Sequence, residues 1–308
     1  MTLLVENVRV LYGFSRGTQA TLSVAQPMLG LLLAGGTSPG RMVLVGLAAF
    51  AAYFAVFAVN DLIDWNIDQQ RFANLREFDG YDIDSAGVRH PLAQGRLSLP
   101  VAASWVASLG AVSLVLAAMI SWVCVVLFVA AGVLEALYCK LARVTPYKTL
   151  LTGVMVALGG CVGWFAVTDA VNDPLLWLFA LWLAAWEIGG RNIVNDLADV
   201  DEDKHLGVRT VPTVYGRRRS GVVSAVGLLV TFAASVGMVL EALPVVGLLG
   251  AAGTLAAGGY ALVWPALRLL RCSEPPTALD VFNRASLYPL VVLGFALLGL
   301  PVHALTGL

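Results

Sequence analysis

Nine long apolar stretches divide this chain, and they constrain its fold more than any other feature. Each is close to the roughly 20 residues that a helix needs to cross the hydrocarbon core of a bilayer. The predicted spans are 18–36, 42–62, 99–118, 121–139, 149–168, 174–194, 220–240, 244–268 and 286–306. A hydrophobic share of 59% and a mean hydropathy of +0.82 agree with lipid as the solvent. Because lipid offers the backbone no hydrogen bonds, we predict an all-α polytopic membrane protein with nine transmembrane helices.

The Lys and Arg residues fall almost entirely on one side of these spans. Of the 19 Lys and Arg residues, only Arg41 lies in a segment that would be outside if the N-terminus is cytoplasmic. The inside segments would then be 1–17, 63–98, 140–148, 195–219 and 269–285. Cytoplasmic loops of membrane proteins carry this excess of positive charge. We therefore predict a cytoplasmic N-terminus and a cytoplasmic active site in an integral, multi-pass protein, of the plasma membrane if bacterial.

Two acidic motifs with the same N-D-x-x-D-x-x-x-D spacing follow the second and sixth predicted spans. Their members are Asn60, Asp61, Asp64 and Asp68 in the first copy and Asn195, Asp196, Asp199 and Asp203 in the second. On a helix, the first, fifth and ninth positions lie on neighbouring turns of one face, where carboxylates repel unless a cation bridges them. Carboxylate oxygens are ligands that Mg²⁺ prefers. One motif alone is also compatible with a solvated acidic helix end, but two copies predict a metal-binding clamp for a diphosphate.

The segments that follow the two motifs also repeat. Gly87-Val88-Arg89 comes after the first motif and Gly207-Val208-Arg209 after the second. Duplicated half-bundles of this kind place equivalent elements on opposite sides of a central cavity. We predict a single domain, 1–308, built as a pseudo-repeat of about 1–145 and 146–308.

Basic residues near the motifs are candidates for binding the diphosphate. They are Lys140, Arg143 and Lys148 in one short loop, and Arg89, Lys204 and Arg209 after the motifs. Arg makes bidentate contacts with phosphate and Lys acts as a point charge. These residues are equally explained as topology determinants that face lipid head groups.

Three charged residues at the ends of predicted spans leave two interpretations open. Arg16, at the start of the first span, either snorkels to the membrane surface or binds an anion, and it is the one candidate to bind an acceptor. Glu187 and Arg191 form an ion pair one turn apart, unless Arg191 faces the cavity.

These motifs resemble those of the UbiA superfamily of intramembrane prenyltransferases, and the resemblance covers nearly the whole chain. Residues 89–98 are similar to the R-P-L-x-x-G-x-I-S stretch of that family, with His90 inserted. Residues 138–145 resemble its tyrosine-containing basic loop, although Ala142 stands where Lys is common.

The resemblance implies an enzyme with nine helices around a lipid-open cavity. The two motifs would hold Mg²⁺ and a prenyl diphosphate, with Asp64, Asp199 and Tyr138 as catalytic residues, and the prenyl group would pass to an aromatic or quinone-precursor acceptor. Aromatic faces could stabilise the intermediate carbocation, and the candidates are Tyr53, Trp65, Tyr138 and Trp164.

Two other functions are compatible with the same residues. An enzyme of this kind could cyclise a prenyl diphosphate without an acceptor. A cation-coupled transporter is a third possibility, but we expect the acids at one membrane face and no charged residue near the middle of a span. The net charge of −1 does not suggest nucleic acid, and no motif indicates a protein partner.

Overall fold

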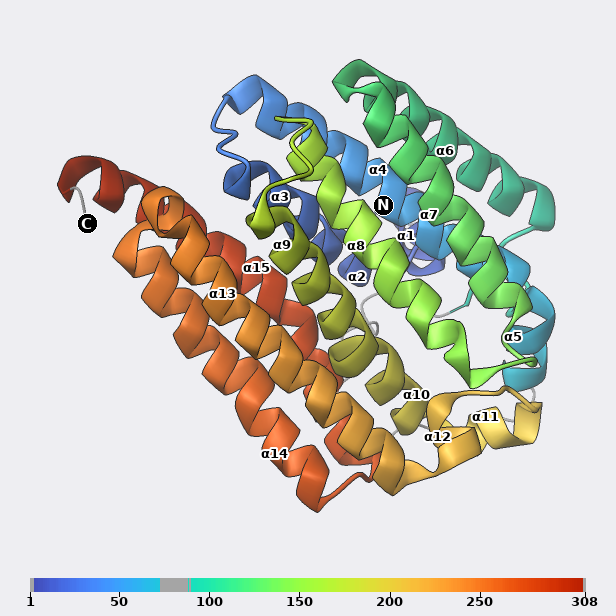
Figure 1. The fold of residues 1–308 in the computed structure, drawn as a ribbon. Helices are drawn as coiled ribbons and strands as arrows, with labels where there is room; N and C mark the ends of the chain where they lie inside the picture. The colour runs from blue at the N-terminus through green and yellow to red at the C-terminus, as the bar shows by residue number, and fades with distance from the viewer. Residues whose placement is uncertain (1–2, 73–87, 89, 307–308) are drawn as a thin grey trace.

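The computed structural model describes residues 3–72, 88 and 90–306 as an assembly of helices, without a strand in those residues (Figure 1). The first half contains α1 Leu3–Phe14, α2 Gly17–Ser23, α3 Ala25–Leu33, α4 Pro39–Ile63, α5 Trp65–Phe72, α6 Leu99–Ile120 and α7 Trp122–Lys140. The second contains η2 Pro146–Lys148, α8 Thr149–Phe165, α9 Pro174–Ala185, η3 Trp186–Asn192, α10 Ile193–Ala198, α11 Val200–Leu206, α12 Val211–Tyr215, α13 Arg217–Gly258, η4 Gly259–Val263, α14 Trp264–Arg271 and α15 Pro275–Thr306.

The predicted spans match helices, but not one for one. Among the described residues, six helices are long and apolar enough to cross a membrane: Pro39–Ile63, Leu99–Ile120, Trp122–Lys140, Pro146–Phe165, Arg217–Arg271 and Pro275–Leu300. The predicted span 18–36 is instead broken between α2 and α3, and 174–194 passes from α9 through the π-helical turn η3 into α10. The spans 220–240 and 244–268 belong to one 55-residue segment. The all-helical membrane class is confirmed, whereas the count of nine separate long helices is not.

The break inside that 55-residue segment has a local cause. Gly247 has a φ of 64° and a ψ of 177°, a backbone conformation that residues with a side chain avoid. Pro244, three residues earlier, lacks the N–H that would continue the helical hydrogen bonds. The chain therefore turns back near Gly247, and α13 contains two helical arms.

The third and fourth predicted spans form a tight helical hairpin. Helix α6 ends at Ile120 and α7 begins at Trp122, so that only Ser121 separates them. Ser121 is extended, with a φ of −166°, and its Oγ accepts a hydrogen bond from the Cys124 N–H at 3.2 Å. Most side chains of α6 are not buried within the protein, which fits a helix that faces lipid.

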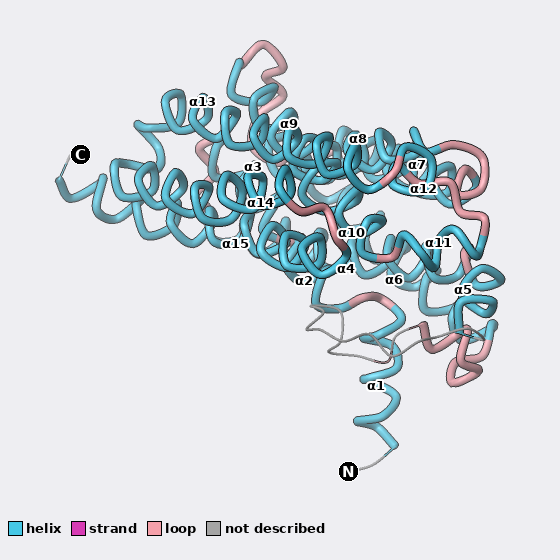
Figure 2. Tube along the Cα trace, turned by 90° about the horizontal axis from the view of Figure 1, so that it is seen from below, coloured by secondary structure: helices cyan, strands magenta, loops and turns pink. Residues whose placement is uncertain are grey.

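The core lies where α3, α8, α9, α13 and α15 pack together. Its largest buried side chains include Trp164, Trp182, Trp186 and Tyr288. The Trp182 indole N–H donates to Ser235 Oγ at 2.8 Å, which satisfies a polar group that burial would otherwise leave without a partner. At one end of this bundle, α5 and α11 lie side by side, while α1 extends away from it (Figure 2).

Candidate active site

A cavity of about 260 Å³ lies between the two halves of the chain, and both acidic motifs line it. All eight of their members do so: Asn60, Asp61, Asp64, Asp68, Asn195, Asp196, Asp199 and Asp203. Residues that are far apart in sequence therefore converge, as the repeat predicts. The apolar part of the wall comes from α3, α4, α6, α7 and α8, and includes Pro27, Ala49, Val56, Phe57, Leu127, Phe128 and Val162.

Each motif is divided by a helix break at its third member. Helix α4 ends at Ile63 and α5 begins at Trp65, so that Asp64 lies between them; Asp199 lies in the same way between α10 and α11. The Asp64 N–H donates to the Asn60 carbonyl at 2.9 Å, and the Asp199 N–H donates to the Asn195 carbonyl at 3.1 Å. The spacing predicts that the motif side chains form a row on one continuous helix, but each motif is instead divided between two helices. The two copies share one backbone geometry nonetheless.

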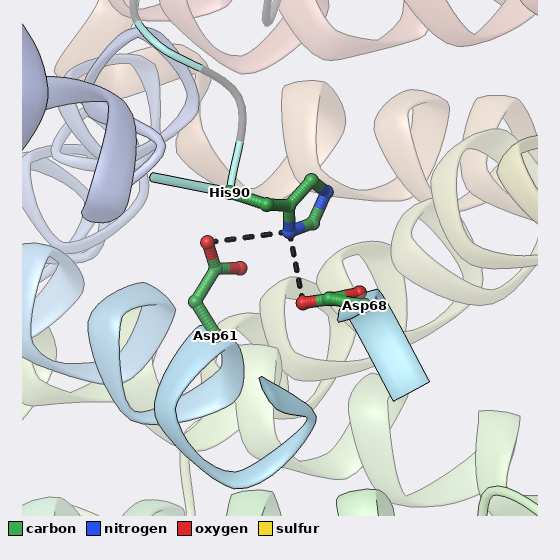
Figure 3. A group of neighbouring side chains, drawn as sticks. All are labelled: Asp61, Asp68 and His90. Carbon is green, nitrogen blue, oxygen red and sulfur yellow. Dashed lines mark ion pairs between the residues drawn. The ribbon is translucent and has the colours of Figure 1, made fainter. Parts of the chain in front are cut away.

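His90 lies between two carboxylates of the first motif (Figure 3). Its Nδ1 is 2.9 Å from Asp68 Oδ2 and 3.3 Å from Asp61 Oδ2, and all three side chains are buried. Burial alone would lower the pKa of His90, but the charges of Asp61 and Asp68 raise it to about 9. The imidazolium therefore places a positive charge between two buried negative ones. No spacing in the sequence suggested this contact, because the chain between Asp68 and His90 is long.

The first two members of the first motif are held from two sides. Arg16 Nη2 donates to Asn60 Oδ1 at 3.1 Å and lies 3.3 Å from Asp61 Oδ1. The Asn60 amide in turn donates to Glu135 Oε1 at 2.9 Å. Arg16, expected to bind an acceptor or snorkel, is here a partner of the acidic motif at the cavity wall.

Among the described residues, Asp64 has no such ion pair with a cation, and it is only partly exposed. Burial, and then the charge of Asp68, raise the pKa of Asp64 to about 7. A nearby cation favours the ionised form of a carboxyl group. Asp64 is therefore a group whose charge state depends on what binds beside it.

Lys148 is the one predicted diphosphate ligand in the described residues that lines the cavity. It is buried at the 3₁₀ turn η2, and its Nζ donates to the Tyr138 hydroxyl at 2.9 Å while lying 4.1 Å from the centre of the Tyr138 ring. The Asn192 amide also donates to that hydroxyl, at 3.2 Å. Asp196 and Asp203 are within electrostatic range of Lys148. Lys148 and Tyr138 thus face the second motif.

The other predicted phosphate ligands do not join this group. Lys140, Arg143, Lys204 and Arg209 are exposed and outside the cavity lining, and Arg89 lies outside the described residues. Arg143 donates to Gln70 at 2.9 Å, which ties the loop after α7 to α5. The Arg209 N–H donates to the Ala142 carbonyl at 2.8 Å. The main chain after the second motif is therefore tied to the basic loop. Of the four aromatic candidates, Tyr53 and Tyr138 line the cavity, and Trp65 and Trp164 do not.

Charged residues within the predicted spans also line the cavity. Glu135, Glu187 and Arg191 are each at most 8% exposed. A carboxylate within an apolar span is costly in lipid and normally faces a cavity or a partner, which is the signal that would have identified Glu135. The sequence pattern also did not identify Gln19 as a cavity residue. Gln19 lines the cavity and accepts a hydrogen bond from Arg191.

The residues at the polar end of the cavity suit a divalent cation. The Asp61 and Asp68 carboxylates each offer a ligand oxygen within 4.8 Å of the other, and the four members of the second motif line the same space. Carboxylate and amide oxygens dominate this set, which is the chemistry that Mg²⁺ favours. The cavity therefore combines a site for cations and anions with an apolar wall.

Comparison with known proteins connects this geometry to a family. A family model described as the UbiA prenyltransferase family matches residues 23–288. A digeranylgeranylglyceryl phosphate synthase of Natronomonas pharaonis is 30% identical over 227 residues, which cover 72% of this chain and 74% of the relative. A 4-hydroxybenzoate octaprenyltransferase of Pseudoalteromonas atlantica is 27% identical over 145 residues, which cover 46% and 48%.

Solved structures show the same fold. A UbiA homologue from Aeropyrum pernix K1 superposes with a TM-score of 0.71 at 19% identity, covering 91% of this chain and 97% of that one. A UbiA homologue from Archaeoglobus fulgidus bound to DMAPP and Mg²⁺ superposes with a TM-score of 0.62 at 15% identity, covering 95% and 99%.

Proposed function

Because this chain belongs to the UbiA prenyltransferase family, and is thus a multi-pass membrane prenyltransferase, we propose that it transfers a prenyl group from an isoprenyl diphosphate to a glyceryl phosphate lipid. Family membership removes the cation-coupled transporter from the alternatives. The observation that carries the proposal is the convergence of two acidic motifs, alike in backbone geometry, on one cavity with an apolar wall.

The carboxylate and amide oxygens of the two motifs would hold Mg²⁺. Bound there, Mg²⁺ would neutralise the diphosphate and the charge that develops on it as the leaving group. The donor set supports this assignment, and so does the solved homologue whose description names Mg²⁺ and DMAPP.

The chain's own residues supply the rest of the donor site. Lys148, buried and aimed at Tyr138 beside the second motif, is placed to bind the diphosphate, and Arg16 and His90 fix the carboxylates of the first motif. The apolar wall surrounds the isoprenoid chain and excludes water from a carbocation. The Tyr138 ring, already close to the Lys148 cation, offers its face to that positive charge.

The proposed reaction breaks the bond between the first prenyl carbon and the diphosphate oxygen, and diphosphate leaves with the electron pair. The acceptor hydroxyl oxygen then forms the new bond to that carbon, and its proton is released. Asp64 and Asp199, at the breaks in the two motifs, remain our candidates for catalytic residues beside Tyr138.

We also propose the nine-crossing topology with a cytoplasmic N-terminus. The segments α2–α3 and α9–η3–α10, and the two arms of α13–η4–α14, would supply the crossings that are not single long helices. A pseudo-repeat divided near residue 145 would then contribute one motif from each half to the cavity.

The two candidate transferase functions differ in their acceptor, which is a glyceryl phosphate lipid in one and an aromatic compound in the other. The relatives that name digeranylgeranylglyceryl phosphate match over about three quarters of their length, and the one that names 4-hydroxybenzoate over about half. We therefore place the glyceryl phosphate class first and retain an aromatic acceptor as the second candidate.

Product analysis tests the assignment. Purified protein should be incubated with Mg²⁺, geranylgeranyl diphosphate, and either geranylgeranylglyceryl phosphate or 4-hydroxybenzoate, and the products identified by mass spectrometry. We expect digeranylgeranylglyceryl phosphate and an equal amount of diphosphate. A prenylated benzoate instead would support the second candidate, and a hydrocarbon formed without an acceptor would make the protein a cyclase.

A further inference from the structure

A second polar cluster, separate from the acidic motifs, lines the same cavity. Its centre is the pair Glu187 and Arg191 on the π-helical turn η3, and both side chains are buried. Single π-helical turns inside longer helices are frequent at functional sites. The proposed donor site makes no use of this pair.

The turn that carries the pair is held tightly by its neighbours. A Cβ atom on Gly153 of α8 would lie 2.7 Å from Ile188 Cδ1, and one on Gly189 would lie 2.7 Å from the Gly227 Cα of α13. Glycine at these positions lets two helices approach the turn closely. The Trp186 indole N–H also donates to the Ala285 carbonyl at 2.8 Å. The position of the pair is therefore fixed by packing on several sides.

The hydrogen bonds of the pair are incomplete. Arg191 Nη2 donates to Gln19 Oε1, but Arg191 Nη1 lies 3.8 Å from Glu187 Oε2, which is too far for a hydrogen bond. Arg191 Nε and Glu187 Oε2 are buried without a hydrogen-bond partner among the described residues. A buried polar group left without a partner destabilises the protein, so two of them at a cavity wall point to a ligand that satisfies both.

The pair also lies next to the donor site. Asn192, the residue after Arg191, donates to the Tyr138 hydroxyl that accepts from Lys148. On the other side, Tyr53 is within electrostatic range of both Glu187 and Arg191, and its hydroxyl donates to Gln26 at 2.7 Å. The cluster therefore lies between the predicted diphosphate ligands and the wall formed by α3 and α4.

The chemistry of the two unsatisfied atoms selects the ligand. Arg191 Nε can only donate, and Glu187 Oε2, as a carboxylate oxygen, accepts. A hydroxyl does both, whereas a phosphate or carboxylate group can only accept and would be repelled by Glu187. We propose that Glu187 and Arg191 bind the free hydroxyl of the acceptor, while the charged part of the acceptor lies elsewhere. This inference rests on the proposed function and assigns a subsite within it.

Paired acceptor analogues test the subsite without turnover. Detergent-purified protein would be saturated with Mg²⁺ and geranylgeranyl thiodiphosphate, an unreactive donor analogue. The dissociation constants of geranylgeranylglyceryl phosphate and of its methyl ether, in which the remaining hydroxyl is capped, would then be measured. We expect the wild-type protein to prefer the free hydroxyl by about tenfold or more. In Glu187→Gln and Arg191→Met the preference should fall to about twofold or less, with unchanged affinity for the thiodiphosphate. Glu274→Gln, which alters an exposed carboxylate, is the matched control.

The outcomes separate this inference from the proposed function. If both variants keep the wild-type preference, or lose thiodiphosphate binding together with it, the subsite assignment is wrong while the transferase assignment stands. If the wild-type protein binds the thiodiphosphate but neither acceptor analogue, the glyceryl phosphate assignment itself is contradicted.

Discussion

At the scale of single residues, the polar end of the cavity is defined by charges that compensate one another. The Asp61 and Asp68 carboxylates share the His90 imidazolium, and Arg16 contacts Asp61 from the other side. Buried charges are tolerated when they are paired in this way. These ion pairs hold the side chains of the first motif in place without a substrate.

The carboxylates at the two helix breaks give the first prediction. Asp64→Ala and Asp199→Ala should each lower kcat by on the order of 10²–10³-fold, because each removes a group that stabilises charge on the diphosphate. Prenyl transfer in purified protein measures the effect. Asp201→Ala is the control, since Asp201 lies in the same helix as Asp203 but is exposed and pairs with Arg217 at 2.6 Å. Activity near the wild-type level in either motif variant would contradict the role proposed for it.

The position of Lys148 gives the second prediction. Lys148→Met should raise the KM for the prenyl diphosphate by about 10- to 100-fold, because a charge-assisted hydrogen bond to phosphate is worth about 1.5–3 kcal/mol. Lys140→Met is the control. Lys140 is exposed and lies eight residues earlier, so that its substitution should leave the KM for the prenyl diphosphate unchanged. Equal effects of the two substitutions would show that the basic loop acts through its overall charge.

The sequence could predict the motif residues but not their partners. Spacing identified Asp64 and Asp199 because equal patterns in an apolar chain are informative without knowledge of the fold. Glu135 could not be assigned a role, since its hydrogen-bond partner Asn60 is 75 residues away. The contact of His90 with Asp61 and Asp68 likewise depends on a left-handed backbone at His90, with a φ of 47°. Spacing could not distinguish Lys148, which is buried, from Lys140, which is exposed.

At the scale of helices, glycine determines how closely the spans of the cavity wall approach. A Cβ atom on Gly163 of α8 would lie 1.7 Å from the Pro27 carbonyl oxygen of α3. Apolar periodicity predicted that these spans exist but not where they bend. The backbone departs from helical angles at the two central aspartates and at Gly247, whereas Val24, between α2 and α3, keeps helical angles.

This close approach gives the third prediction. Gly163→Ala should destabilise the protein by about 1–3 kcal/mol, because the added methyl group forces backbone atoms of α3 and α8 apart. The thermal unfolding midpoint in detergent measures the change. Gly110→Ala is the control, since a Cβ atom at Gly110 of α6 would meet no atom within 4 Å. Equal unfolding midpoints for the two variants would show that α3 and α8 can separate without cost.

At the scale of the whole molecule, two similar elements face one cavity from different halves of the chain. The break at Asp64 between α4 and α5 has its counterpart at Asp199 between α10 and α11, and α5 and α11 are neighbours. This arrangement agrees with the proposed pseudo-repeat. It also requires both motifs to lie on the same side of the membrane, which the distribution of Lys and Arg predicts to be the cytoplasm.

Cysteine labelling tests that topology and gives the fourth prediction. Cys272 is the exposed cysteine, in a predicted inside segment, and Cys124, Cys139 and Cys161 are buried. A membrane-impermeant maleimide should label Cys272 only after the cells are permeabilised. Arg41→Cys, in a predicted outside segment, should be labelled in intact cells. Labelling of Cys272 in intact cells would reverse the proposed orientation.

Equilibrium binding of geranylgeranyl thiodiphosphate shows whether the two acidic motifs form one metal-dependent diphosphate site. Binding would be measured against Mg²⁺ concentration for the wild-type protein, for Asp64→Asn, for Asp199→Asn and for the double variant. We predict that binding requires Mg²⁺, that each single substitution weakens it by about tenfold or more, and that the double variant loses less than the two single losses combined, because the groups share one ligand. Binding that is independent of Mg²⁺, or losses that add as for separate sites, would show that the two motifs do not form one metal-dependent site.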